Sequence, residues 1–467
     1  VSPQEAKKDT EGTYIDYKTW NVPIKTLFNY CLKKMKTKIY PDLVKGVRGT
    51  VGSDHTPEHV MKAILRAKHK IHVNKEGTVR YDASEITLTH FKPCEVGAPV
   101  DKLRSLGYTH DIYGNPLTKE DQVLELFVQD LVLPACPDSP DPGSDVVLMN
   151  TAKFIDDLLV HLYKQEPYYN ISSREDLIGH LIIGLAPHTS AGTVGRIIGF
   201  SQTQGMMAHP LYHQAMRRDC DGDESCFLLQ LDAFLNFSKK FLGTSRGSTM
   251  DAPLVLTTLL NPAEVDDQVF TMSISGPYPL EFYEACNNFK MPWDVNIKKI
   301  KDVLFTKEQF EGMMFTHDTS SINNARLCSE YKTLPSMGEK IERQMDLAEK
   351  IRAVNTSDVA RLVIEKHFIR DTKGNLRKFS LQQFRCVGCN EKYRRPPLSG
   401  KCLVCGGKII FTISQGSIIK YVEMSLMLAE KYNVSNYLKE SLYLTRKRIL
   451  DVFGKEKEKQ AGLGDFM

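Results

Sequence analysis

Two pairs of cysteines constrain the fold of this chain more than any other feature of its sequence. Cys386 and Cys389 form one CxxC pair, Cys402 and Cys405 form another, and twelve residues, 390–401, separate them. Each pair brings two thiolates to one side of a tight turn, and two such turns complete a tetrahedral zinc site. Redox-active or free cysteines are the alternative, but doubled CxxC pairs at this spacing are typical of zinc modules. Because a four-sulfur site is closed, we expect a structural zinc ribbon.

The other cysteines are scattered singly. The total of 11 is odd and no secretory signal precedes it, which favours a reducing compartment such as the cytoplasm. We expect the seven lone cysteines to act as buried small hydrophobic residues; they are Cys31, Cys94, Cys136, Cys220, Cys226, Cys286 and Cys328.

The length of the chain predicts several domains in an α+β arrangement. A chain of 467 residues exceeds one ordinary core, and no run reaches the roughly 20 apolar residues of a membrane helix. A segment with four prolines, 134–145, has linker composition. The predicted domains are an N-terminal α/β region (1–135), a catalytic domain with an acidic motif (136–265), a mostly helical region (266–380), the zinc ribbon (381–414), C-terminal helices (415–453) and a flexible tail (454–467).

Hydrophobic patterning predicts the main elements. Residues 148–166 and 224–242 are each expected to form a long helix, and the β-branched run 193–201 and the apolar run 251–260 are expected to be strands. Further along the chain, helical periodicity covers four segments, 337–354, 357–369, 417–432 and 434–453.

The stretch "RRDCDGDES" (217–225) is the strongest catalytic candidate. Asp219, Asp221 and Asp223 alternate along the chain, an arrangement that points side chains to one side of a strand or turn. Converging carboxylates need a cation, and oxygen ligands select Mg²⁺ or Mn²⁺ over zinc. Gly222 suits the sharp turn of a metal loop. Arg217 and Arg218 directly precede the motif, which suits phosphate binding beside a divalent metal.

Two other interpretations of this stretch remain open. An EF-hand calcium loop needs Glu at its twelfth position, where counting from Asp219 reaches Gln230. Alternatively, the carboxylates lie at the start of a helix and interact with its dipole.

Several longer stretches resemble a known family. "EDLIGHLIIGLAPHTSAGTVGRIIGF", "AHPLYHQAMRRDCDGDES", "MDAPLVLTTLLNP", "FTHDT" and "FRCVGCNEKYRRPPLSGKCLVCGGKI" are similar to the large, catalytic subunit of the archaeal D-family DNA polymerases. The resemblance runs from about residue 44 to the C-terminus in unbroken order.

The resemblance implies a DNA-directed DNA polymerase built on double-psi β-barrels. The family's "NCDGDED" motif places its metal-binding aspartates at Asp221 and Asp223, while Asp219 and Ser225 replace an Asn and an Asp of that motif. Asp219 keeps an oxygen ligand. A second barrel with basic residues lies upstream in the family, so we expect this chain to be a C-terminal portion that cannot polymerise alone.

The resemblance also implies ligands and partners. Primer-template DNA, dNTPs, catalytic Mg²⁺ (or Mn²⁺), structural Zn²⁺, the small exonuclease subunit, the upstream part of the large subunit and a sliding clamp are expected, with a nucleoid-associated location and no membrane. Candidate DNA or nucleotide contacts are Arg217, Arg218, His188 and Arg196. The tail "QAGLGDFM" fits a sliding-clamp peptide through Gln460, Leu463, Phe466 and Met467. His317 and Asp318 lie in a family motif without an assigned role.

Two functions of other kinds remain as alternatives. A nucleotidyltransferase related to multisubunit RNA polymerases would share the barrel and the acidic core. A non-catalytic assembly module of the replisome would use the ribbon to hold a partner.

Overall fold

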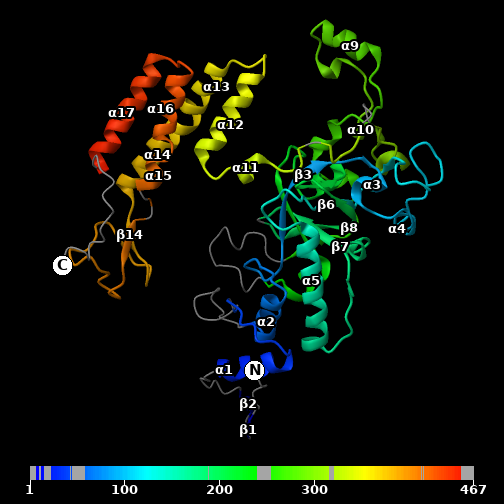
Figure 1. The fold of residues 1–467 in the computed structure, drawn as a ribbon, viewed down its shortest axis with the longest axis horizontal. Helices are drawn as coiled ribbons and strands as arrows, with labels where there is room; N and C mark the ends of the chain where they lie inside the picture. The colour runs from blue at the N-terminus through cyan, green and yellow to red at the C-terminus, as the bar shows by residue number, and fades with distance from the viewer. Residues whose placement is uncertain are drawn as a thin grey trace. The chain divides into compact units, whose positions relative to one another are not determined.

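The computed structural model describes residues 7–9, 12–14, 23–42, 44, 58–187, 189–238, 254–314, 320–324, 326–411, 413 and 415–453 (Figure 1). The chain divides into two compact units, Val1–Ser329 (unit 1) and Glu330–Met467 (unit 2). Within the described ranges, no helix combines the length and the apolar character needed to cross a membrane.

Unit 1 is built around a sheet whose strands lie in the order β11-β8-β6-β9-β3-β10-β7. Because β7 also pairs with β8, six of these strands are joined in a closed ring. Three pairings, β3–β9, β6–β8 and β8–β11, are parallel and the others are antiparallel. The strands are β3 (Tyr81–Thr87), β6 (Asp130–Pro134), β7 (Leu181–Leu185), β8 (Ala191–Ser201), β9 (Gly205–Ala208), β10 (Glu224–Leu229) and β11 (Val255–Thr257).

Most strands of the ring are buried on both faces, whereas β3 alternates between buried and exposed residues. Every residue of β6 and β9 is buried, as are all but two residues of β8. Strands covered on both sides have continuous rather than alternating apolar sequences. The helix α5 (Ser144–Leu158) packs Phe154 and Ile155 into the same hydrophobic core as Leu131 and Ile197, and a π-helical turn, Leu159–Tyr163, continues it.

A smaller core in unit 1 includes Phe91, Leu103, Leu124 and Ile198. The remaining elements of unit 1 are short. They are β1 (Lys7–Asp9), β2 (Gly12–Tyr14), α1 (Ile24–Lys34), α2 (Val60–Lys68), β4 (His90–Phe91), α3 (Pro93–Val96), α4 (Val100–Ser105), β5 (Leu124–Glu125), α6 (Pro210–Ala215), α7 (Gln230–Asn236), α9 (Leu280–Asn287), α10 (Ile300–Val303) and the 3-10 turns Arg174–Leu177, Pro262–Glu264, Asp267–Thr271, Pro292–Asp294 and Lys307–Phe310.

Unit 2 is a helical bundle that carries a small sheet. Its helices share one core, which includes Ile364, Ile418, Leu428 and Leu442. The sheet, β13-β12-β14, follows α14 in the chain and precedes α15. The elements are α11 (Glu330–Thr333), α12 (Met337–Lys350), α13 (Thr356–Leu362), a π-helical turn (Val363–Phe368), α14 (Ile369–Leu381), β12 (Phe384–Cys386), β13 (Lys392–Tyr393), β14 (Ile409–Phe411), α15 (Gln415–Ile419), α16 (Val422–Lys431) and α17 (Asn436–Phe453).

The mixed α+β class is confirmed, but the boundary at residue 135 does not separate two folding units. β3 and β6 precede it, and they pair with β9, β10 and β8, which follow it. The proline-rich segment is therefore a connection between β6 and α5 inside unit 1. The pairing of strands that are distant in the sequence, rather than the composition of the segment between them, decides which residues fold together.

The prediction of one long helix over 224–242 is wrong. Its first part is the strand β10, which lies between β3 and β7, and only Gln230–Asn236 is helical before the described residues end at 238. The strand over 193–201 is confirmed within β8. Of the apolar run 251–260, Val255–Thr257 forms a strand, although at the edge of the sheet rather than buried.

Candidate metal centres

The acidic motif lies in the loop between α6 and β10, which we call the acidic loop (217–223). His209 caps the N-terminus of α6, and its Nδ1 accepts a hydrogen bond from the N–H of Leu211 at 3.2 Å. The helix is held in the core by Tyr212, whose hydroxyl donates to the Thr193 carbonyl at 2.8 Å. The loop therefore connects a helix that is anchored in the core to a strand of the ring.

The acidic loop is not the extended strand that would place its three aspartates on one side. Arg217, Cys220 and Gly222 have φ angles of 62°, 63° and 96°. Glycine adopts such angles freely, whereas the two other residues are strained there, at a cost on the order of 1–3 kcal/mol each. The loop therefore needs contacts outside itself to hold this shape.

Glu85 on β3 supplies two of those contacts. The main-chain N–H of Glu85 donates to the Asp223 carbonyl at 2.9 Å, and the N–H of Asp221 donates to Glu85 Oε1 at 3.1 Å. These hydrogen bonds lie on either side of Gly222. They fix the backbone of the two aspartates to the edge of β3.

The second carboxyl oxygen of Glu85 faces His213 of α6. His213 Nδ1 lies 3.4 Å from Glu85 Oε2, both side chains are fully buried, and His213 Nε2 lies 3.0 Å from the Ile86 carbonyl. With the Nε2 proton donated to that carbonyl, Nδ1 is an acceptor that faces Oε2, and neither of these two atoms has a hydrogen-bond partner within the described residues.

Burial governs the pKa values of these groups. It raises the pKa of Glu85, against the lowering effect of the backbone N–H groups of the loop. It lowers the pKa of His213 to about 4 and that of His209, which is completely enclosed, to about 3. Both histidines are therefore neutral near pH 7.

The aspartate side chains themselves are open. Asp219 and Asp221 are exposed, and Asp223 is partly exposed, with one oxygen 3.4 Å from Nη1 of Arg218. Within the described ranges, these carboxylates do not form a compact group of three metal ligands. Oxygen donors beside a guanidinium suit a hard divalent cation that also contacts phosphate. Arg217 is exposed next to them.

Arg196, a predicted DNA contact, is engaged inside unit 1. Its Nε and Nη2 donate to Asp130 at 2.8 and 2.7 Å, and Asp130 also accepts from the buried Tyr108 hydroxyl at 2.7 Å. These hydrogen bonds raise the pKa of Arg196. This network joins β8 to β6, so it accounts for Arg196 without a ligand. His188, His317, Asp318 and the tail residues Gln460, Leu463, Phe466 and Met467 lie outside the described residues.

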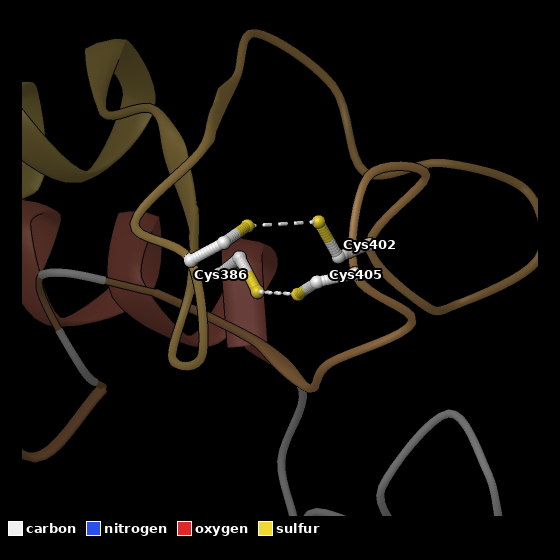
Figure 2. Close-up of side chains that lie close together, drawn as sticks. Cys386, Cys402 and Cys405 are labelled. Atoms are coloured by element: carbon white, nitrogen blue, oxygen red, sulfur yellow. Dashed lines mark hydrogen bonds between the residues drawn. The ribbon is translucent and has the colours of Figure 1, made fainter. Parts of the chain in front are cut away.

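The four predicted zinc ligands meet in unit 2. The Sγ atoms of Cys386, Cys389, Cys402 and Cys405 all lie within 4.8 Å of one another, and no disulfide joins them (Figure 2). Cys386 faces Cys405 and Cys389 faces Cys402, each pair at 3.4 Å. Unbridged thiols this close fit a tetrahedral ion such as zinc.

Other groups around the sulfurs complete this site. The Tyr393 hydroxyl lies 3.1 Å from Cys402 Sγ and lowers the pKa of that thiol to about 6. A Cβ at Gly407 would lie 3.0 and 3.1 Å from the sulfurs of Cys386 and Cys405. Only glycine leaves both sulfurs undisturbed, because real Cβ contacts are rarely so short.

Sequence reasoning singled out the aspartates and the cysteines as candidates but did not single out Glu85. The available signal was a carboxylate at an inward position of β3, where the neighbouring inward residue is Ala83. A glutamate in the buried register of a strand requires partners. Those partners became visible only once β3 was placed beside the acidic loop.

Unit 1 therefore presents an open carboxylate loop that enters a ring of paired strands, and unit 2 presents a cluster of four cysteines that fits a tetrahedral ion. Residues 36–340 match the family described as "DNA polymerase II large subunit DP2, catalytic domain". The chain belongs to this family, as the resemblance predicted.

Curated archaeal proteins named "DNA polymerase II large subunit" are similar over nearly the whole chain. The protein of Archaeoglobus fulgidus is 51% identical over 428 residues, 91% of this chain and 37% of the relative. That of Methanococcus maripaludis is 48% identical over 448 residues, 95% of this chain and 39% of the relative. The chain therefore spans less than two fifths of the length of these relatives.

Proposed function

We propose that this chain carries the metal-binding part of the active site of a replicative, archaeal family D DNA polymerase. The reaction is the transfer of a nucleotide from a dNTP to the 3′ end of a DNA primer. The observation that carries the proposal is the acidic loop, fixed to β3 inside a chain that belongs to the large-subunit family.

The six-stranded ring is proposed to be a double-psi β-barrel. Closure of the ring and its mixture of parallel and antiparallel pairings support this assignment. In such a barrel, the acidic loop is a connection between a helix and a barrel strand, which presents its side chains at the rim.

Asp221 and Asp223 are the proposed Mg²⁺ ligands, and Asp219 is a third ligand or a hydrogen-bond acceptor next to the ion. A bound divalent ion supplies charge stabilisation to the phosphoryl oxygens and lowers the pKa of a bound hydroxyl. Arg217 and Arg218 are placed to neutralise substrate phosphate, since Arg218 already lies beside Asp223. His188 and Arg196 stay weaker predictions, and the Asp130 ion pair makes a structural role the simpler account of Arg196.

The four-cysteine cluster is proposed to hold structural zinc and to form the docking site of the small exonuclease subunit. Residues 384–411 contain six basic residues and one acidic residue, a net charge of +5 before the four thiolates and the zinc ion are counted. The exposed residues Val387, Leu403 and Val404 add apolar surface at the CxxC turns. An acidic partner with an apolar centre would complement this surface. The tail around Leu463 and Phe466 is proposed to bind the sliding clamp.

Primer extension tests the proposal. We expect no synthesis with Mg²⁺ from this chain alone, because the relatives carry more than half of their length elsewhere. Synthesis should appear when the chain is combined with the remainder of the large subunit and the small subunit, and should disappear in the Asp221→Asn plus Asp223→Asn variant. Full activity of that double variant would instead favour the assembly-module alternative.

A further inference from the structure

We propose that Glu85 and His213, which we call the loop anchor, position the metal-binding aspartates of the acidic loop. The role is that of a positioning pair rather than of a catalytic residue, because neither side chain reaches the surface where substrate would bind. The inference rests on the proposed function of the loop, and it assigns a role to residues outside the acidic motif.

Glu85 is buried among apolar residues of the ring. The side chain occupies an inward position of β3 and is fully buried, as is that of His213. A carboxyl group in an apolar interior costs several kcal/mol unless hydrogen bonds replace its water. An apolar residue would be the expected occupant of this site if packing alone mattered.

The hydrogen bonds of Glu85 reach both proposed metal ligands. Glu85 binds the loop once through its side chain, at Asp221, and once through its main chain, at Asp223. Glu85 alone therefore holds the main-chain groups of both proposed ligands, Asp221 and Asp223, beside β3. A metal ion that binds both aspartates benefits because their backbones are already ordered.

The loop anchor also contacts α6, the helix that precedes the acidic loop. His213 connects Glu85 to α6 and, through the Ile86 carbonyl, back to β3. Glu85 Oε2 and His213 Nδ1 lie 3.4 Å apart, and within the described part of the chain neither atom makes a hydrogen bond, so each is the nearest polar group available to the other. The pair thus links the helix before the loop to the strand beside it, and it opposes the strain stored at Arg217 and Cys220.

Substitutions at Glu85 separate positioning from simple packing. Glu85→Gln keeps an oxygen that accepts the Asp221 N–H and places an amide donor opposite His213 Nδ1. Glu85→Leu keeps the approximate volume but removes both functions. Glu95 is a matched control, because it is also a buried carboxylate that accepts backbone N–H groups, those of Lys92 and Ile322 at 2.8 and 3.2 Å, but outside the acidic loop.

The first readout is amide hydrogen exchange of the peptide covering residues 217–223 in the full chain, without metal. We expect exchange to become at least about tenfold faster in Glu85→Leu and to stay near wild type in Glu85→Gln and Glu95→Leu. Equal acceleration in Glu85→Leu and Glu95→Leu would overturn the inference, because it would show only global destabilisation.

The second readout is the Mg²⁺ concentration for half-maximal primer extension by the reconstituted polymerase. We expect an increase of at least about tenfold in Glu85→Leu, with recovery in Glu85→Gln and no change in Glu95→Leu. An unchanged Mg²⁺ requirement in Glu85→Leu contradicts the anchor. Failure of the proposed function is distinguishable, because it would appear as an active Asp221→Asn plus Asp223→Asn variant, while the exchange measurement still tests the anchor.

Discussion

The two candidate metal centres differ in how much of each site exists before an ion binds. In unit 2, four sulfur atoms already lie within 4.8 Å of one another, supplied by two turns of one short segment. In unit 1, the acidic loop has a fixed backbone but open carboxylates, one of them beside Arg218. A closed site stabilises a fold, whereas an open one leaves coordination positions for substrate.

The two sites also differ in which atoms the neighbouring residues contact. Tyr393 and Gly407 act directly on the sulfurs, through a hydrogen bond and through space left by a missing Cβ. Glu85 acts on the main chain of the acidic loop instead. The thiolate site is therefore built around its ligand atoms, and the carboxylate site around its backbone.

Removal of the ion from the four-cysteine site should have the largest effect. A strong chelator, or Cys402→Ser, is expected to unfold the small sheet β13-β12-β14, because small zinc modules depend on their metal for folding. Near-complete loss of amide protection over residues 384–411 would be measured by hydrogen exchange. If the amides of residues 384–411 stayed protected in the zinc-free chain, the four-cysteine site would not be needed for folding, which would contradict its structural role.

Loss of a single carboxylate in the acidic loop should act on rate without unfolding. Asp221→Asn and Asp223→Asn are each expected to lower the primer-extension rate of the reconstituted polymerase by at least about 10²-fold, the contribution of several kcal/mol of charge stabilisation. Circular dichroism of the chain should be unchanged, since both side chains reach solvent. Near-normal rates in both variants would exclude these residues as ligands.

Acid should weaken unit 1 through its buried histidines. The pKa is about 3 for His209 and about 4 for His213, both below the ordinary 6.5, because burial disfavours the charged ring. Between pH 6.5 and these values the unfolded chain binds protons that the folded chain does not. Stability is therefore full above pH 6.5 and falls by about 1.4 kcal/mol per pH unit for each histidine as the pH decreases.

His209→Asn isolates this effect. Asparagine retains a side-chain acceptor for the Leu211 N–H at the start of α6 but does not titrate. Urea denaturation between pH 6.5 and 5 should show a shallower loss of stability in the variant than in the wild type. Parallel pH profiles would mean that His209 is not held neutral by burial.

The smallest expected effect is that of Tyr393→Phe. Removing the hydroxyl that lies 3.1 Å from Cys402 Sγ should weaken zinc binding by about tenfold while the module still folds with zinc. Competition with a chromophoric chelator measures the change. Wild-type affinity in the variant would show that the hydroxyl contributes packing only.

The sequence predicted best those features that depend on local spacing. The four cysteines meet as their two CxxC pairs indicated, and the helical periodicities over 337–354 and 434–453 correspond to α12 and α17. In each case, residues a few positions apart determine the geometry. No distant partner is needed to form a helical turn or a CxxC turn.

The features that the sequence did not reveal depend on distant pairing. Residues 224–229 have an apolar run that suits a buried helix equally well, and they form β10 because β3 and β7 flank them. Glu85 was missed for the same reason, since its partners Asp221 and Asp223 lie more than a hundred residues away. Arg196 was a candidate DNA contact in the sequence, where its ion-pair partner Asp130, 66 residues earlier, could not be recognised.

The most direct test of the account is to count bound Mn²⁺ and zinc in the same reconstituted polymerase with primer-template DNA. Electron paramagnetic resonance would report Mn²⁺, and elemental analysis would report zinc. We predict that Asp221→Asn plus Asp223→Asn abolishes Mn²⁺ binding at the active site and leaves the zinc of the four-cysteine site intact. Unchanged Mn²⁺ binding in that variant would contradict the assignment of the acidic loop as the catalytic metal site.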